Sequence, residues 1–416
     1  MLSTQEDDRG LDVSVMKPEE LAAVRTGLLA FAGEMFTPLA RADQRRWGEI
    51  YLRGLMVDGR RKSIEPMAAR LPDGDEQCLQ QFVNQSPWEV EPVRRRLARR
   101  MVAELAPLAV IVDDTGFPKA GRYSVGVARQ YSGTLGKVGN CQIGVSLSAA
   151  SEAASCPIDW RLFLPQAWDD DPERRARAHL PDGERHRAKW RLALEMLDEL
   201  AGWGVAIPAV VADAGYGEIS AFRDALAERG LAYVVEVSGT TSAYDLAVRA
   251  EQPPWRGSGR PPARRYRAAP SSLRALALGA GPGAARRLAW REGSRGTMRS
   301  RFLCLRCRPA NIGLRRSHRE QLPAAWLLCE WPAGEAEPVK YWLANLPEQS
   351  GLAELVRLAK LRWRIELDYR ELKDALGLDH FEGRSFRGWH HHVTLVSVAH
   401  AFLTLQRLDP KAHAPV

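Results

Sequence analysis

Apolar positions recur along the chain with two different periods, and these periods divide it into segments. Between Pro18 and about Leu105, apolar residues return every three to four positions, which predicts amphipathic helices. From Leu108 to Val237, short apolar runs alternate with helical stretches, which is typical of an α/β core with parallel pairing. The pattern predicts an all-helical amino-terminal domain at 1–105 and the first part of an α/β core at 106–237.

Within this core, the first apolar run covers Leu108 to Asp114 and stops at Thr115 and Gly116, so we expect a buried strand that ends at two acids. The other expected elements are a hairpin of Tyr123–Gln130 and Asn140–Ser148, strands at Asp159–Leu164, Ala209–Asp213 and Tyr233–Val237, and helices at Lys189–Trp203 and Glu218–Arg229.

After Val237 the alternation stops, and residues 238–350 are rich in Pro, Gly and Arg. Strand-like patterns occur there at Arg287–Arg291, Arg301–Arg308, Ala325–Trp331 and Lys340–Leu346, which predicts a mostly β insertion domain. Helical patterns return in 351–416, at Gly351–Leu378 and His391–Leu405, and we expect these helices to complete the core.

Charge is concentrated in the predicted insertion. The whole chain carries a formal net charge of +8, whereas residues 238–350 alone hold 19 Lys and Arg against 8 Asp and Glu, a local +11. A basic region of this kind favours a polyanionic partner. Basic clusters such as Arg94-Arg95-Arg96 also occur among the predicted helices, where contact with DNA and simple solvation are equally good interpretations.

Other features narrow the class of protein. The acidic amino terminus has no apolar core, and the run from Val393 to Leu405 is too short to span a bilayer, so we expect a cytoplasmic protein without membrane contact. Cys304, Cys307, His318 and Cys329 could be drawn as a zinc site, but the pattern favours cysteines packed in a strand. We interpret His390, His391 and His392 as DNA-proximal or surface residues, because neighbouring helix positions cannot all face one ion.

Two acids close the core strands. Asp114 and Asp213 each follow an apolar run, and carboxylates at such strand ends project into the crevice at the edge of an α/β sheet. There they could hold two Mg²⁺ ions about 3.5–4 Å apart for in-line phosphoryl transfer. An acid in this position can also cap the next helix, and a phosphatase or kinase-like site stays open on this spacing alone.

Longer segments narrow this choice. The stretches VIVDDTGFPKAGRYSVGVARQYSGTLGKVGNCQIGVSLSAAS, VVADAGYGE and LAKLRWRIELDYRELKDALGLDHFEGRSFRGWHHH closely resemble insertion-sequence DDE transposases of the cut-and-paste type. The likeness extends along nearly the whole chain, including RADQRRWGEIYLRGL near the amino terminus. It implies an RNase H-like catalytic core with a β insertion domain.

The resemblance also implies a set of site residues. The family's carboxylates carry over to Asp114, Asp213 and Glu366, which would hold Mg²⁺, or Mn²⁺ in its place. Asp113 is the neighbour that alternation along a strand turns to the opposite side, so we expect it either to support the metal-binding residues or to lie on the surface. The family's Tyr-x2-Arg-x3-Glu-x6-Lys pattern matches Arg362, Glu366 and Lys373, which share one face of a continuous helix. Its Tyr position holds Ala359, and Tyr369 is a candidate to replace it.

In this family the insertion is implied to hold the transposon end and an extruded base. A stacking platform needs an aromatic ring beside cations, which favours Trp290 with Arg286, Arg287 and Arg291, and then Trp255 with Arg256. Packing in a core is the alternative for both tryptophans.

The function that follows is recognition of inverted-repeat ends in double-stranded DNA, cleavage, and joining of 3′-OH ends to target DNA, with a homodimer in the synaptic complex and association with the nucleoid. Two rivals remain. One is a catalytically silent descendant that only binds DNA, and the other is a metal-dependent nuclease without strand transfer.

Overall fold

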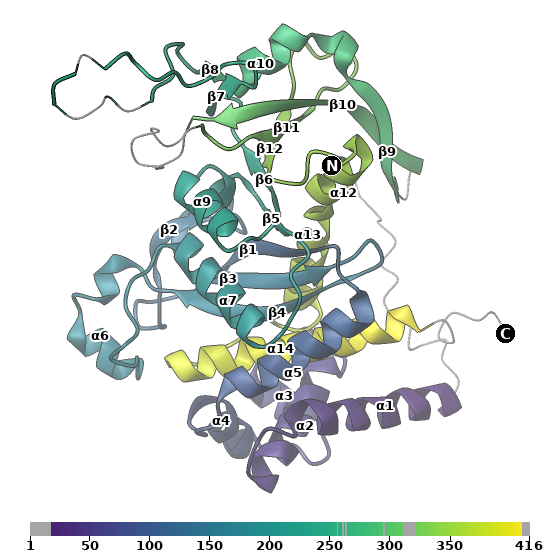
Figure 1. Cartoon of the computed structure of the whole chain (residues 1–416). Helices are drawn as coiled ribbons and strands as arrows, with labels where there is room; N and C mark the ends of the chain where they lie inside the picture. Colours follow the sequence, from purple (N-terminus) through teal and green to yellow (C-terminus); the bar gives the residue numbers. More distant parts are fainter. Residues whose placement is uncertain are drawn as a thin grey trace. The chain divides into compact units, whose positions relative to one another are not determined.

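The computed structural model describes residues 18–255, 257–259, 262, 264–293, 296–310 and 321–409 (Figure 1). The chain forms two compact units. The first takes in residues up to Ile207 and those from Trp363 onward, and the second is Pro208–Arg362. The second unit therefore interrupts the first in sequence, and it combines segments from three of the four domains predicted above.

The amino-terminal helices confirm the helical pattern. They are α1 (Pro18–Phe36), α2 (Ala42–Met56), α3 (Ile64–Arg70), α4 (Glu76–Asn84) and α5 (Val90–Leu105). Their buried faces pack against the long helix α14 (Phe386–Leu408), which contacts α1, α2, α4 and α5 (Figure 1). The two ends of the chain's first unit thus share one apolar core.

Antiparallel strands form the sheet of the first unit. They are β1 (Ala109–Pro118), β2 (Ala128–Ser132), β3 (Lys137–Ala150) and β4 (Ser155–Phe163), with β3 paired to the other three. The predicted hairpin is confirmed with shifted bounds. The remaining elements of this part are a 3-10 turn at Gln166–Trp168, α6 (Pro172–Arg177) and α7 (Lys189–Gly202).

Strand β1 is longer than its apolar run, so the expected end at Asp114 is wrong. Thr115 and Gly116 were expected to form a turn, yet Gly116 pairs with Ile143 inside the ladder. A Cβ on Gly116 would lie 2.2 Å from Ser132 Oγ. This glycine therefore allows the β2–β3 hairpin to approach β1 closely, and Asp113 and Asp114 lie in the middle of the strand.

The strands of the second unit include one parallel pair. The strands β5 (Val210–Ala212) and β6 (Tyr233–Val237) pair in parallel, as predicted, and they flank α8 (Ala214–Gly217) and α9 (Ser220–Glu228). The strand order continues as β6-β12-β11-β10-β7-β8, with β9 on the side of β10. The bounds of these strands are β7 (Ser242–Asp245), β8 (Ser271–Ser272), β9 (Arg286–Gly293), β10 (Gly296–Pro309), β11 (Ala325–Glu330) and β12 (Lys340–Ala344).

The predicted insertion strands are thus confirmed, and they extend the same sheet as β5 and β6. Short helical pieces that the sequence pattern did not predict lie among them, namely α10 (Leu273–Ala280) and a 3-10 turn at Pro282–Ala284. Helix α12 (Leu352–Leu361) closes this unit, and α13 (Trp363–Asp374) opens the returning part of the first. Among the described residues, no helix has both the length and the apolar character needed to cross a membrane.

Candidate functional site

The two neighbouring acids of β1 face opposite sides of the sheet. Asp113 lies opposite Ser146 of β3 and is 5% exposed, whereas Asp114 lies opposite Val145 and is partly exposed. Because directly opposed residues of an antiparallel pair share a face, each aspartate can be assigned to a face through its partner. The Oδ1 atom of Asp113 accepts the backbone N–H of Asp114 at 2.7 Å.

Helices cover the two faces differently. Ser146, on the face of Asp113, shares a 2.7 Å hydrogen bond with the hydroxyl of Tyr369 in α13. On the same face, Phe117 makes an edge-on contact with Trp389 of α14. Asp114 faces α7 instead, where Lys189 Nζ lies 2.7 Å from its Oδ2. This lysine has no distinctive sequence context, and sequence reasoning missed it.

Asp213 lies in the second unit at the start of α8. It occupies the N-cap position, but its side chain makes no capping hydrogen bond. Its Oδ1 is buried and finds no hydrogen-bond partner within the described part of the chain. Its Oδ2 lies 3.6 Å from Arg362 Nη2. The structure therefore brings together Asp213 and Arg362, which are far apart in sequence, and it does not support the capping alternative for Asp213.

Glu366 lies in the first turn of α13 and is exposed. The single helix expected over Gly351–Leu378 is wrong, because the helix breaks at Arg362 between α12 and α13. The shared-face argument consequently holds for Glu366 and Lys373 within α13 but loses its basis for Arg362.

Lys373 joins α13 to the sheet. Its Nζ donates to Gly116 O at 3.0 Å and to Thr134 Oγ1 at 2.8 Å. Burial lowers the pKa of Lys373, and the nearby carboxylates of Asp379 and Asp374 oppose that shift. Two of its three ammonium protons are therefore engaged inside the unit. Tyr369 is similarly engaged, since its hydroxyl bonds to Ser146 and its ring lies beside Trp160.

The aromatic candidate of the insertion, Trp290, is partly buried in β9. Its ring meets Phe302 edge-on, and Lys360 Nζ of α12 lies 4.6 Å from the ring centre. Lys360 also contacts Phe302 and Trp342, and it pairs with Glu330 Oε2 at 2.5 Å. These contacts support the packing interpretation of Trp290.

The basic neighbours of Trp290 divide between the two faces of the strand. Arg286 lies opposite Phe302 and so shares the face of Trp290, whereas Arg287 lies opposite Arg301 on the other face. The register shifts at Arg291, which lies opposite Met298. Arg286 and Arg287 are exposed. Trp255 is 54% exposed, and its partner Arg256 lies outside the described residues.

The histidine run of α14 is buried, so its interpretation as a surface feature is wrong. His391 Nδ1 and Nε2 each lie 2.8 Å from a carbonyl oxygen, of Val83 and Trp88, and one of these contacts is a hydrogen bond in the neutral ring. His392 lies between the Tyr51 hydroxyl, 2.8 Å away, and Gly377 O, 3.0 Å away. Burial lowers the pKa of His392 to about 3 and that of His391 to about 4. The run connects α14 to the amino-terminal helices.

The cysteines of the second unit pack in its sheet. Cys307 and Cys329 are buried, and Cys304 is half-buried. Burial raises the pKa of the Cys304 and Cys307 thiols to about 12, so both stay protonated near neutral pH. Cys304 and Cys307, three positions apart on β10, face opposite sides of the sheet. His318 lies outside the described residues.

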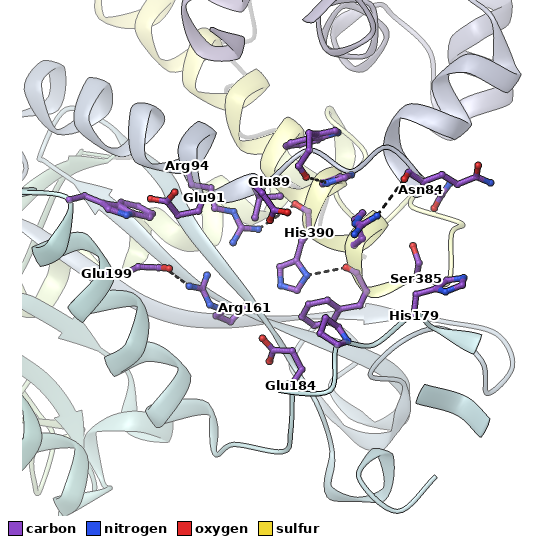
Figure 2. A pocket seen from close by; sticks show the side chains of 18 residues that line it. Asn84, Glu89, Glu91, Arg94, Arg161, His179, Glu184, Glu199, Ser385 and His390 are labelled. Carbon is purple, nitrogen blue, oxygen red and sulfur yellow. Dashed lines mark hydrogen bonds and ion pairs between the residues drawn. The ribbon is translucent and has the colours of Figure 1, made fainter. Parts of the chain in front are cut away.

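A cavity of about 660 Å³ lies in the first unit, between α5, α7 and the start of α14 (Figure 2). Figure 2 shows Arg161 paired with Glu199 on one side, and the ring of His390 facing the space. Neither acid of β1 lines it, nor does Glu366. The cavity is therefore separate from the predicted carboxylate site.

Across the described ranges, no three His, Cys, Asp or Glu side chains gather closely enough to hold a metal ion. Asp113, Asp114 and Glu366 belong to the first unit, and Asp213 belongs to the second.

Comparison with known proteins matches these positions to a family. Residues 34–297 match the model of the DDE superfamily endonucleases, which includes both acids of β1 and Asp213 but stops before Glu366. Over 187 residues the chain is 28% identical to a probable transposase for insertion sequence element IS701 from Microchaete diplosiphon. That alignment covers 44% of this chain and 46% of the relative, so the chain spans about half the length of the curated relative it matches. Because the family match takes in well over half of the residues, the chain belongs to the DDE superfamily of endonucleases.

Proposed function

We propose that this protein is a transposase that cleaves the inverted-repeat ends of a DNA element and joins the 3′-OH ends to target DNA. Family membership supports the nuclease chemistry, and the name of the relative, a probable transposase for an insertion sequence, supports strand transfer. The observation that carries the proposal is Asp213, a strand-end carboxylate with a buried oxygen that has no hydrogen-bond partner in the described chain.

This oxygen fits a hard divalent cation. Mg²⁺ prefers carboxylate oxygens and water, and a buried acceptor without a donor is costly unless a cation or donor occupies the space beside it. We propose that Asp213, Glu366 and one aspartate of β1 hold the metal ions, with Asp114 as the aspartate that the sequence motif assigns. Bound there, two such ions would activate the attacking oxygen and stabilise the leaving oxygen.

The chain's own residues have separate roles around these acids. Arg362 lies 3.6 Å from Asp213 and would orient that carboxylate, and its guanidinium would also contact a DNA phosphate. Hydrogen bonds from Lys373 to Gly116 and Thr134 hold α13 against the sheet, and they would thereby fix the position of Glu366 relative to β1. Arg286, Arg287 and Arg291 would hold the phosphates of the transposon end.

The proposal is tested with DNA duplexes taken from the flanks of the coding region. Asp213→Asn and Glu366→Gln keep side-chain shape and remove a charge, so we expect each to abolish Mg²⁺-dependent cleavage while binding to the duplex changes less than about threefold. Glu218→Gln, at the end of α8, and Glu354→Gln, in α12, change exposed acids outside the proposed metal site, so these controls should cleave normally.

Adding a target plasmid to the same assay separates the rivals. A transposase gives joined products, a plain nuclease gives cut ends only, and a silent descendant gives neither while still binding the duplex. Cleavage that survives in purified Asp213→Asn would remove Asp213 from the site and with it the observation on which the proposal rests.

A further inference from the structure

We propose that Asp113, rather than Asp114, is the β1 carboxylate that holds metal and faces the scissile phosphate. This inference rests on the proposed function and changes the assignment of one of its three acids. It follows from which helix covers each face of the first unit's sheet.

The face of Asp113 is the face covered by α13. Asp113 lies directly opposite Ser146, and Ser146 Oγ is 2.7 Å from the hydroxyl of Tyr369. In antiparallel strands, side chains that are directly opposed lie about 4.5–5.5 Å apart at Cβ. The carboxylate of Asp113 therefore lies beside the point where α13 contacts the sheet.

Glu366 projects from the same side of α13. At about 100° per residue, Glu366 lies about 60° from Tyr369 and about 20° from Lys373 around the helix. Tyr369 contacts β3 opposite Asp113, and Lys373 donates to Gly116 O of β1. The two residues that share this side of α13 with Glu366 therefore both contact the sheet. Glu366 lies about one turn before Tyr369 on this side of the helix, and its side chain is exposed.

Asp114 is directed to the other face, away from α13. It lies opposite Val145, and on that face its Oδ2 is 2.7 Å from Lys189 Nζ at the first position of α7. The ammonium already balances its charge and occupies space beside the carboxylate where a cation would bind. Arg161, opposite Val145 on the far strand, belongs to the same face and pairs with Glu199 of α7. The face of Asp114 is thus an ion-paired contact between sheet and helix.

Metal binding by the full-length protein tests this without reliance on turnover. We expect Mn²⁺ to raise the melting temperature of wild type, and Asp113→Asn to need at least tenfold more Mn²⁺ for half of that rise. Asp114→Asn is the matched control and should keep the wild-type Mn²⁺ response. As a second readout, Fe²⁺ with ascorbate and peroxide should cut the wild-type backbone near bound metal, and this cut should be lost in Asp113→Asn and kept in Asp114→Asn.

A cysteine variant covers the case in which Asp113→Asn fails to fold. A thiolate is a softer ligand than a carboxylate and favours Mn²⁺ over Mg²⁺. We therefore expect Asp113→Cys to cleave DNA with Mn²⁺ but not with Mg²⁺, a change of metal preference that a purely structural residue would not produce.

The outcomes separate this inference from the proposed function. If Asp114→Asn loses the Mn²⁺ response while Asp113→Asn keeps it, or if Asp114→Cys alone shows the change of metal preference, the inference is overturned and the proposed function stands. If neither variant, nor Glu366→Gln or Asp213→Asn, alters the Mn²⁺ response, both are overturned.

Discussion

Single residues in the first unit show that a polar side chain of a helix can be buried and can link separate elements by hydrogen bonds. His392 accepts from the Tyr51 hydroxyl at one ring nitrogen and donates to Gly377 O from the other, which satisfies the neutral ring. Both ring nitrogens of His392 therefore bond to the protein, and neither faces water. The sequence pattern could not reveal this, because both partners of His392 lie on other elements.

This burial predicts sensitivity to acid. Burial lowers the pKa of His392 from 6.5 to about 3, so below pH 6.5 the unfolded chain takes up a proton that the folded chain refuses. Stability is therefore lost as the pH falls from 6.5, by about 3 kcal/mol at pH 4 for this group. His392→Gln should flatten the dependence of unfolding free energy on pH in that window, as measured by urea titrations. Wild type serves as the reference, and an equal slope in wild type and variant would contradict the prediction.

Arg94 is a charged side chain that is likewise buried and links separate elements. The side chain is 3% exposed, and it bonds to Asp159 Oδ1 at 3.0 Å, to Thr394 Oγ1 at 2.8 Å and to Trp160 O at 2.7 Å. Arg161 Nη1 also lies 3.1 Å from Asp159 Oδ1, so removing Arg94 leaves this fully buried carboxylate with one of its two cations. Breaking a buried ion pair from one side is strongly destabilising. We expect Arg94→Met to lower the free energy of unfolding by about 3–5 kcal/mol.

The neighbouring Arg95 provides the control. It is exposed and pairs with Glu91 one turn away, so Arg95→Met should change the free energy of unfolding by less than about 0.5 kcal/mol. Denaturant titrations of both variants measure the difference. Similar losses in the two would mean that the Asp159 contact is not the source of stability.

At the scale of elements, β9 determines what Trp290 can do. The register of β9 against β10 shifts beside Trp290, between Met298 and Arg299 of β10. Such bulges re-aim side chains, and they depend on the partner strand, so the sequence of β9 alone does not predict one. Here Trp290 is directed onto Phe302 and Lys360, which connects β9, β10 and α12.

Trp290→Ala should therefore act on stability before it acts on DNA. Loss of a large packed ring typically costs about 3–5 kcal/mol, and the partly buried site of Trp290 places the effect at the lower end. We expect a lower melting temperature and equal slowing of first-strand nicking and second-strand cleavage. Trp255→Ala, at a 54% exposed tryptophan, should melt like wild type. Selective slowing of the second cut at normal melting temperature would instead restore the base-stacking role.

Much of the secondary structure followed from the sequence, and the failures have physical causes. Periodicity predicted the strands around Asp213 and the strands of the insertion, because each has a clear apolar run. It placed the end of β1 at Thr115-Gly116, since a glycine needed for close strand approach resembles a glycine in a turn. It also missed the break at Arg362, where backbone angles stay helical and no proline or glycine marks the interruption.

For the candidate site, the sequence predicts residue types but not the direction in which each side chain faces. The resemblance supplied the acids, and the pairing of Asp213 with Arg362 adds a contact that no spacing rule gives. Which of Asp113 and Asp114 faces α13 depends on the register with β3 and on helices more than 200 residues later in the chain. Strand alternation shows that the two differ but not which one faces inward.

At the scale of the whole molecule, positive charge is unevenly distributed and should control the salt dependence of DNA binding. Phosphate contacts release counterions, with about one unit of slope in log K against log salt for each contact. Changing Arg286, Arg287 and Arg291 together to Gln should lower the slope by up to about three units for a flanking duplex. Arg41→Gln removes an exposed charge already paired with Asp43 and should leave the slope unchanged. An unchanged slope in the triple variant would move the DNA contact to another basic surface.

The interrupted first unit has a consequence for synthesis on the ribosome. Its four strands are all present in sequence by Phe163, but the helices that cover the Asp113 face, α13 and α14, come after Arg362. At about 5–20 residues per second, the nascent chain waits roughly 10–30 seconds between the two parts. During this interval the second unit can form while one face of the first unit's sheet has yet to receive its cover. The emerging chain is thus most prone to aggregation or proteolysis before α14 has been translated, and slowing elongation across 208–362 should lower the yield of soluble protein.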